Sequence, residues 1–242
     1  MPPTGPRHIV SKYDQELANL HDLLARMGEL AQGQMAATID ALLAGDAGAA
    51  SRVMAEDSAV NACEHEVNEQ SVRLLALRSP VADDLRAVVT GLKVASAIER
   101  VADHAANVAS RTLALNQHTP KAALRGIVHL GRLVADLFAQ ALDAYLARAP
   151  DRAMEVWRRD QEVDDLHSSL FRELLTYMME DPRTITACSH LVFIAKDLER
   201  VGDQATNIAE MTSYLVTARP ITDDRPKRDV SSSIGAGSDE DV

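Results

Sequence analysis

Hydrophobic side chains recur at alternating intervals of four and three residues along most of the chain, which is the spacing of a packed helix face. A clear instance is the series Val94, Ile98, Val101, Ala105 and Val108. Runs that are rich in β-branched residues and alternate with period two do not occur, so no strand is predicted. The chain is therefore predicted to be all-α.

Glycine and proline mark the ends of six predicted helices. The 242 residues include only 11 glycines and 9 prolines, and good helix formers dominate between them. The predicted spans are about 11–43, 47–77, 82–115, 122–148, 152–180 and 184–217. Helices of about 30 residues are much longer than the usual ~11–12, so they need extensive mutual packing. Antiparallel bundles joined by short loops provide it.

The second half of the chain repeats the first. The segment from Glu99 to Asn107 (ERVADHAAN) recurs from Glu199 to Asn207 (ERVGDQATN), and apolar positions of the preceding helices also correspond. Such a repeat indicates one supersecondary unit used twice, here two tandem antiparallel three-helix bundles. Residues 11–117 form the first repeat and 118–217 the second, with an N-terminal extension at 1–10. The polar residues 218–242 are expected to be a disordered acidic tail.

Composition narrows the class of function. The net charge of −11 argues against a general nucleic-acid binder and against tight electrostatic docking on anionic lipid. Two cysteines are too few for a disulfide scaffold or a cysteine-rich metal site. Neither a secretory signal nor a membrane-spanning apolar run is visible, so the cytoplasm is the expected compartment.

Carboxylates and amides form a stripe in each repeat. Glu99, Asp103 and Asn107 lie at i, i+4 and i+8, so they share one helix face, as do Glu199, Asp203 and Asn207 at the matching positions. The helix before each stripe carries its own i, i+4 pair, which is Asp57 and Asn61 in the first repeat and Asp160 and Asp164 in the second.

The hairpin turns bring these two sets to the same height. Asp57 lies 23 residues before Pro80 and Asp103 lies 23 after it, while Asp160 lies 22 before Pro182 and Asp203 lies 21 after it. Oxygen-only sets suit hard or borderline cations such as Mg, Mn and Fe. The alternative is a solvated acidic face whose charge Arg100 and Arg200 offset. The two matching copies favour metal binding, and the sequence predicts no catalytic residue and no organic cofactor site.

The sequence resembles the PhoU family of bacterial phosphate-uptake and phosphate-signalling regulators. The segments that carry the resemblance are 74–86 (LLALRSPVADDLR), 99–103 (ERVAD), 176–185 (TYMMEDPRTI) and 194–208 (IAKDLERVGDQATNI). With the repeat, the resemblance spans roughly residues 10–217. The sequence departs from the family pattern in the first repeat, where Ala97 and Ala102 stand in place of the acid and the glycine that Asp197 and Gly202 supply in the second.

The resemblance implies a six-helix protein that is not an enzyme and that binds iron, zinc, manganese or magnesium. It implies a cytoplasmic negative regulator of the phosphate-starvation response, peripheral to the inner face of the membrane. The implied partners are the ATPase of the phosphate ABC transporter and a PhoR-type sensor histidine kinase. A homodimer is compatible with the sequence. By position, the implied metal ligands are Glu99, Asp103, Asn107, Glu199, Asp203, Asn207, Asp57, Asn61, Asp160 and Asp164.

Two other functions compete with a signalling adaptor. A carboxylate-metal-dependent hydrolase or phosphatase would need an open coordination position and a group that activates water. A metal store of the ferritin type would need a Glu-x-x-His motif, which the sequence lacks. Both therefore rank below the adaptor.

Overall fold

The computed structural model of the chain describes residues 6–221, with side chains from Tyr13 onward except that of Asp57. The described part holds six long helices and no strand, which confirms the all-α prediction. None of these helices is both long enough and apolar enough to cross a membrane. The helices are α1 (Pro6–Ala44), α2 (Ala47–Arg78), α3 (Ala82–Thr112), α4 (Lys121–Leu146), α5 (Pro150–Glu180) and α6 (Ile185–Thr217), with a short 3₁₀ turn at Pro182–Thr184.

The helix ends lie close to the predicted ones, with two differences. Helix α1 begins at Pro6 rather than near Ser11. Helix α3 ends at Thr112 rather than near Leu115. The predicted acidic tail falls, from residue 222 onward, outside the described residues.

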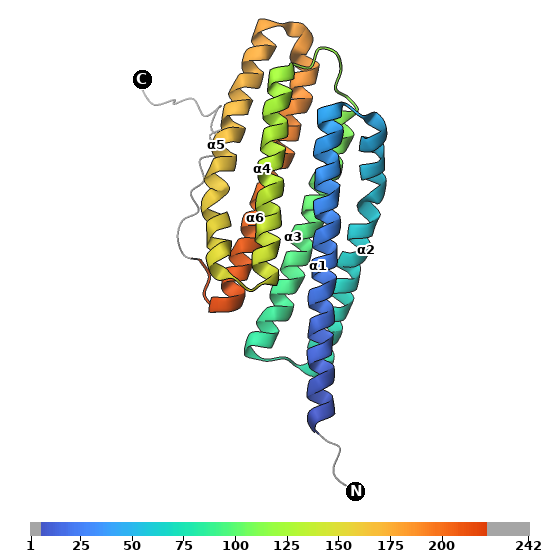
Figure 1. Cartoon of the computed structure of the whole chain (residues 1–242), viewed down its shortest axis with the longest axis vertical. Helices are drawn as coiled ribbons and strands as arrows, with labels where there is room; N and C mark the ends of the chain where they lie inside the picture. The colour runs from blue at the N-terminus through green and yellow to red at the C-terminus, as the bar shows by residue number, and fades with distance from the viewer. Residues whose placement is uncertain (1–5, 222–242) are drawn as a thin grey trace, which may run out of the picture.

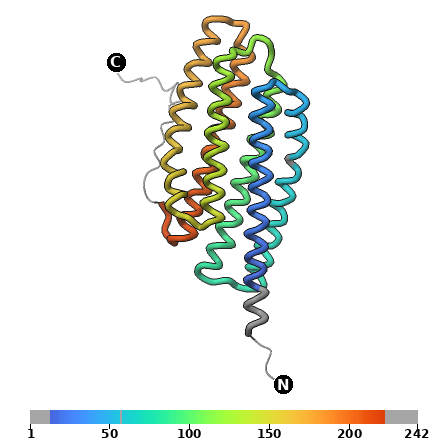
Figure 2. The backbone as a smooth tube through the Cα atoms, viewed as in Figure 1, coloured from blue at the N-terminus to red at the C-terminus, as the bar shows by residue number. Residues whose placement is uncertain are grey.

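Two three-helix bundles lie side by side in an elongated molecule (Figure 1). Helices α1, α2 and α3 all contact one another, and so do α4, α5 and α6. The two bundles meet through α3 against α6 and α1 against α4, while α2 and α5 each contact only their own bundle. The α2–α3 turn and the α5–α6 turn lie at opposite ends of the long axis (Figure 2), so equivalent helices of the two repeats run antiparallel.

One apolar core runs through both repeats. The seam residues of α3 and their counterparts in α6 belong to it, and each is fully buried. These residues are Val94, Ile98, Val101, Ala105 and Val108 in α3 and Ile194, Leu198, Val201, Ala205 and Ile208 in α6. Because the core is shared, burial across the α3–α6 contact stabilises both bundles together.

A buried tyrosine also joins the repeats, through a side-chain contact between α4 and α3. Burial raises the pKa of Tyr145 in α4 to about 12, because a phenolate would lose its hydration there. The hydroxyl hydrogen-bonds to Thr90 of α3 and lies 3.6 Å from the place of a Cβ on Gly91. The small glycine therefore makes room for this contact between α4 and α3.

The turns have local causes. Helix α1 ends at Gly45, whose φ of 65° favours glycine, and Asp46 then caps α2 by accepting a hydrogen bond from the backbone N–H of Ala49 at 3.0 Å. At the other hairpins, Pro80 follows the left-handed Ser79 and Pro182 follows Asp181. Proline cannot continue the preceding helix, so both hairpins turn where the sequence predicts.

A close approach of α5 to α6 depends on Gly202. A Cβ at this position would lie 3.1 Å from Cγ1 of Val163, a β-branched side chain with little rotamer freedom. We expect Gly202→Ala to lower the free energy of unfolding by about 1–3 kcal/mol, measured by urea denaturation.

The matched control is Gly33→Ala in α1. Gly33 is an exposed helical residue with nothing within 4 Å of its Cβ position. The same substitution there should stabilise the protein by about 0.5–1 kcal/mol, because alanine has the higher helix propensity. Equal effects at the two sites would show that helix propensity, and not the contact with Val163, decides the result.

Candidate functional site

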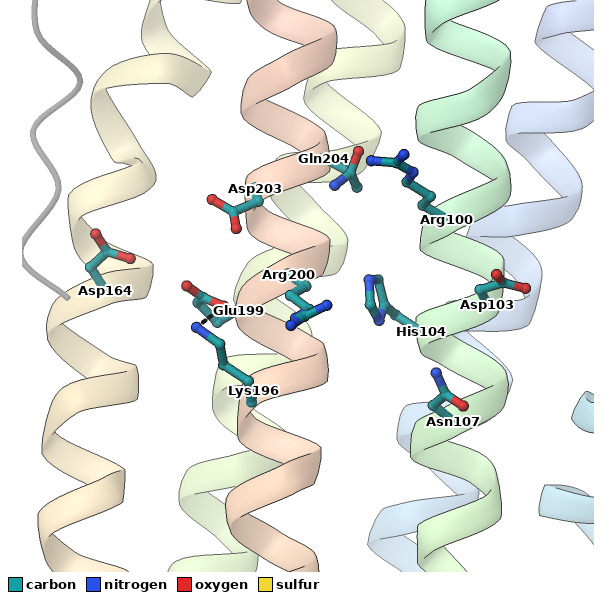
Figure 3. Close-up of a pocket in the computed structure, with 10 residues that line it drawn as sticks. All are labelled: Arg100, Asp103, His104, Asn107, Asp164, Lys196, Glu199, Arg200, Asp203 and Gln204. Atoms are coloured by element: carbon teal, nitrogen blue, oxygen red, sulfur yellow. Dashed lines mark ion pairs between the residues drawn. The ribbon is translucent and has the colours of Figure 1, made fainter. Parts of the chain in front are cut away.

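A charged cleft of about 730 Å³ opens between the two repeats. Its walls come from α3 and α6, with one residue from α5 (Figure 3). The lining side chains are nearly all polar and of both signs, and they are Arg100, Asp103, His104, Asn107, Asp164, Lys196, Glu199, Arg200, Asp203 and Gln204. The cleft therefore combines parts of both predicted stripes in a single site.

The carboxylates of the second repeat are largely buried. Asp160, Asp164 and Glu199 are 3%, 7% and 6% exposed, and Asp203 is half-buried. A buried carboxylate loses its hydration, so it needs a hydrogen bond or an opposite charge to offset that loss. An oxygen of Asp160 accepts a hydrogen bond from Thr206 Oγ1 at 3.0 Å, and Lys196 Nζ lies 2.9 Å from Glu199 Oε2.

The hairpin argument holds for this repeat. Thr206 lies less than one turn after Asp203 on α6, so its hydrogen bond places Asp160 of α5 at the predicted height. In Figure 3, Asp164 also lies beside the stretch of α6 that carries Glu199 and Asp203, which are about one turn apart. Spacing from the proline turn was thus sufficient to bring these carboxylates together.

The first repeat presents its stripe differently. Asp103 and Asn107 are exposed, while Glu99 and Asn61 are half-buried. In Figure 3 the carboxylate of Asp103 points away from α6, as that of Asp203 points away from α3, so the two repeats differ in exposure and not in direction. The side chain of Asp57 lies outside the described residues. The two copies of the motif therefore have different surroundings, although their sequences match.

The donor chemistry suits a hard cation, because the carboxylates and amides supply oxygen ligands. The described side chains, which leave out that of Asp57, include no group of three or more His, Cys, Asp or Glu residues placed to hold a metal ion. The oxygens of the second repeat would therefore have to move closer together to share one ion. Asn207 has another contact, since its Nδ2 donates to Gln204 Oε1 at 3.3 Å.

Asp197 contacts the other repeat. Its carboxylate lies 3.1 Å from His104 Nδ1 and 3.6 Å from Arg111 Nε, both on α3. The guanidinium of Arg111 also lies over the ring of Phe193, 4.3 Å from the centroid. Asp197 joins the two bundles, and this explains why the counterpart, Ala97, need not be acidic.

Sequence reasoning left several lining residues without a role in a site. Lys196 and Gln204 carry no motif of their own, and the arginines Arg100 and Arg200 were interpreted only as counter-charges. The repeat offset of 100 does relate Arg100 to Arg200 and His104 to Gln204. The repeat shows that these residues occupy equivalent positions. Only the docking of α3 on α6 places them in one cleft.

Comparison with known proteins identifies the family. The model of the PhoU domain matches residues 24–112 and 127–212, which is one match for each repeat. The chain belongs to the PhoU family. The resemblance found in the sequence is thus confirmed, and so is the duplication of the PhoU unit.

Relatives across the bacteria match almost the whole chain. A PhoU homologue from Caulobacter vibrioides is 46% identical over 93% of this chain and 98% of its own. One from Rhizobium meliloti is 40% identical over 96% of this chain and 98% of its own. Both are named phosphate-specific transport system accessory protein PhoU homolog.

Crystal structures of PhoU proteins share the fold. PhoU from Pseudomonas aeruginosa superposes with a TM-score of 0.82 at 36% identity, covering 86% of this chain and all of the other. The phosphate transport system regulatory protein PhoU from Streptococcus pneumoniae superposes with a TM-score of 0.81 at 27% identity. The match covers 86% of this chain and 99% of the other. The PhoU architecture therefore extends over both repeats of this chain.

Proposed function

We propose that this protein is an accessory regulator of phosphate-specific transport that acts by binding partners. The family match over both repeats carries this proposal, since relatives of 40–46% identity are named as accessory proteins of that system. Long helices with exposed faces are suited to helical partners. The expected role is a negative regulator that connects the ATPase of the phosphate ABC transporter to a PhoR-type sensor histidine kinase at the cytoplasmic face of the membrane.

We also propose that the regulator carries a divalent or trivalent cation, with iron, zinc, manganese and magnesium as the candidates. The buried carboxylates of the second repeat support this, because a bound cation would offset their charge. The ligands would be Asp160, Asp164, Glu199 and Asp203, drawn closer together on binding. The corresponding residues of the first repeat would form a weaker site, since Asn61 replaces a carboxylate and Asp103 is exposed.

Deleting the gene tests the regulatory role. In phosphate-rich medium the deletion strain should take up phosphate faster and express its starvation regulon, because the restraint on the kinase and the transporter is lost. Uptake of radioactive phosphate and a starvation-promoter reporter measure the two effects. The intact protein, tagged and purified from phosphate-replete cells, should bring the transporter ATPase and the kinase with it. A deletion strain with normal uptake, normal reporter output and no second copy of the gene would overturn the proposal.

A metal-dependent hydrolase is the second candidate, and one observation favours it. His104 borders the cleft and is oriented by Asp197, which is the arrangement that positions a general base. Against it, the relatives that match almost the whole chain are named as accessory proteins of phosphate-specific transport. Hydrolysis of a phosphoester by the metal-loaded protein, lost in His104→Ala, would favour the hydrolase over the adaptor.

A further inference from the structure

Two arginines at equivalent positions of the repeats extend into the cleft from opposite walls. Arg100 belongs to α3 and Arg200 to α6, and both are exposed and line the cleft. In Figure 3 both side chains reach into the space between the two helices. Within the part of the chain that the structure describes, neither guanidinium has an ion-pair or hydrogen-bond partner. Six other arginines of the described residues form ion pairs, as Arg78 does with Glu16 at 2.9 Å.

The duplication explains why the two arginines converge. Helices α3 and α6 pack antiparallel, so residues at equivalent positions are related by an approximate twofold axis through their contact. Each arginine is followed by a fully buried valine, Val101 or Val201, which anchors the backbone in the core. The backbone that carries each arginine is therefore held by a rigid element.

The acidic residues of the cleft lie to the sides of this pair. Figure 3 shows Asp103 turned away from α6, and Asp164 and Asp203 between α5 and α6. Lys196 offsets the charge of Glu199 at 2.9 Å. The centre of the cleft is left to the two arginines, with Gln204 and His104 as neighbouring hydrogen-bonding groups. An anion at this centre would meet donors before it meets carboxylates.

We propose that Arg100 and Arg200 together bind the phosphate group of an anionic ligand in the cleft between α3 and α6. A guanidinium presents a planar fork of N–H donors that matches two phosphate oxygens, and a tetrahedral phosphate has oxygens for two such forks. The choice of phosphate among oxyanions rests on the proposed function. A cleft of about 730 Å³ admits free phosphate as well as the phosphate group of a mononucleotide.

Equilibrium dialysis of the full chain against labelled ligands tests the proposal. Orthophosphate, AMP and ATP are used in separate arms, and sulfate serves as a competitor. We expect saturable binding of one phosphate ligand per chain, weakened at least about tenfold in Arg100→Gln and in Arg200→Gln and lost in the double variant. Tightest binding of orthophosphate would identify free phosphate as the ligand, and tightest binding of AMP or ATP would identify a nucleotide.

The matched control is the double variant Arg125→Gln, Arg132→Gln. Both residues are exposed on α4, outside the cleft, and the change in net charge is the same. The control should bind like the wild type, and circular dichroism should show unchanged helix content in every variant. Absence of saturable binding in all arms, or equal binding in the wild type and the folded Arg100→Gln, Arg200→Gln protein, would overturn the proposal.

The binding experiment and the gene deletion test the anion site and the regulatory role separately. A deletion strain that derepresses phosphate uptake, combined with a protein that binds no phosphate ligand, would reject the anion site and keep the regulator. A protein that binds phosphate through both arginines, in a cell whose phosphate response does not depend on the gene, would reject the regulator and keep the site.

Discussion

Replacing Glu199 and Asp203 together by alanine is expected to abolish most of the metal binding that we propose for this protein. Glu199 is 6% exposed and Asp203 half-buried, on the same face of α6 and toward Asp164 of α5. Removing two of the four carboxylates halves the negative charge that attracts a cation. The affinity of a site for a hard cation depends strongly on the number of charged ligands. Metal content after purification without chelator, and titration of the stripped protein with manganese, measure the loss.

The duplication supplies the control for this experiment. The double variant Glu99→Ala, Asp103→Ala removes the equivalent residues of the first repeat. Its effect should be much smaller, because Asp103 is exposed and the facing position carries Asn61 rather than an aspartate. Unchanged metal stoichiometry in the Glu199, Asp203 variant would show that these carboxylates do not hold the metal.

Replacing Phe138 by alanine is expected to lower the free energy of unfolding by about 3–5 kcal/mol. Phe138 is fully buried, and it lies on α4, which contacts α1, α5 and α6. The substitution removes apolar burial and leaves a cavity where the two bundles share their core, and such a cavity collapses only in part. Since about 1 kcal/mol corresponds to about 2–4 °C in a protein of this size, the melting temperature should fall by about 6–20 °C.

Phe193→Ala separates burial from the loss of an aromatic ring. Phe193 is 53% exposed, and its ring stacks on the guanidinium of Arg111. Removing this ring should lower the free energy of unfolding by about 0.5–1 kcal/mol, which is the usual strength of a cation–π contact at an exposed site. Urea unfolding of both variants, followed by circular dichroism, gives the comparison. Similar losses in the two variants would show that burial of Phe138 contributes no more to stability than an exposed ring does.

The helices and their turns were predictable because their causes are local. The spacing of apolar residues, the prolines at 80 and 182, and the glycine at 45 act over a few residues, so they can be read along the chain. The heights of Asp160, Asp164, Glu199 and Asp203 followed from the same local geometry, since a regular helix converts residue number into rise. The internal repeat then predicted two bundles of one kind.

The asymmetry between the two metal motifs was predictable only in part. The sequence shows that Asn61 and Ala102 stand where the second repeat has Asp164 and Gly202. It does not show that Glu199 is buried while Asp103 is exposed, because burial depends on how closely the helices of each hairpin approach. In the second repeat, Gly202 permits that close approach to Val163.

The sequence by itself thus determined the six helices, the duplication and the level of the carboxylates within each hairpin. Only the tertiary structure decided that α3 packs on α6, that Asp197 pairs with His104, and that Arg100 and Arg200 share one cleft. The physical reason is that contacts within a hairpin are set by turn and rise. Contacts between repeats depend instead on how two amphipathic surfaces dock, and periodicity does not specify the angle or register of that docking.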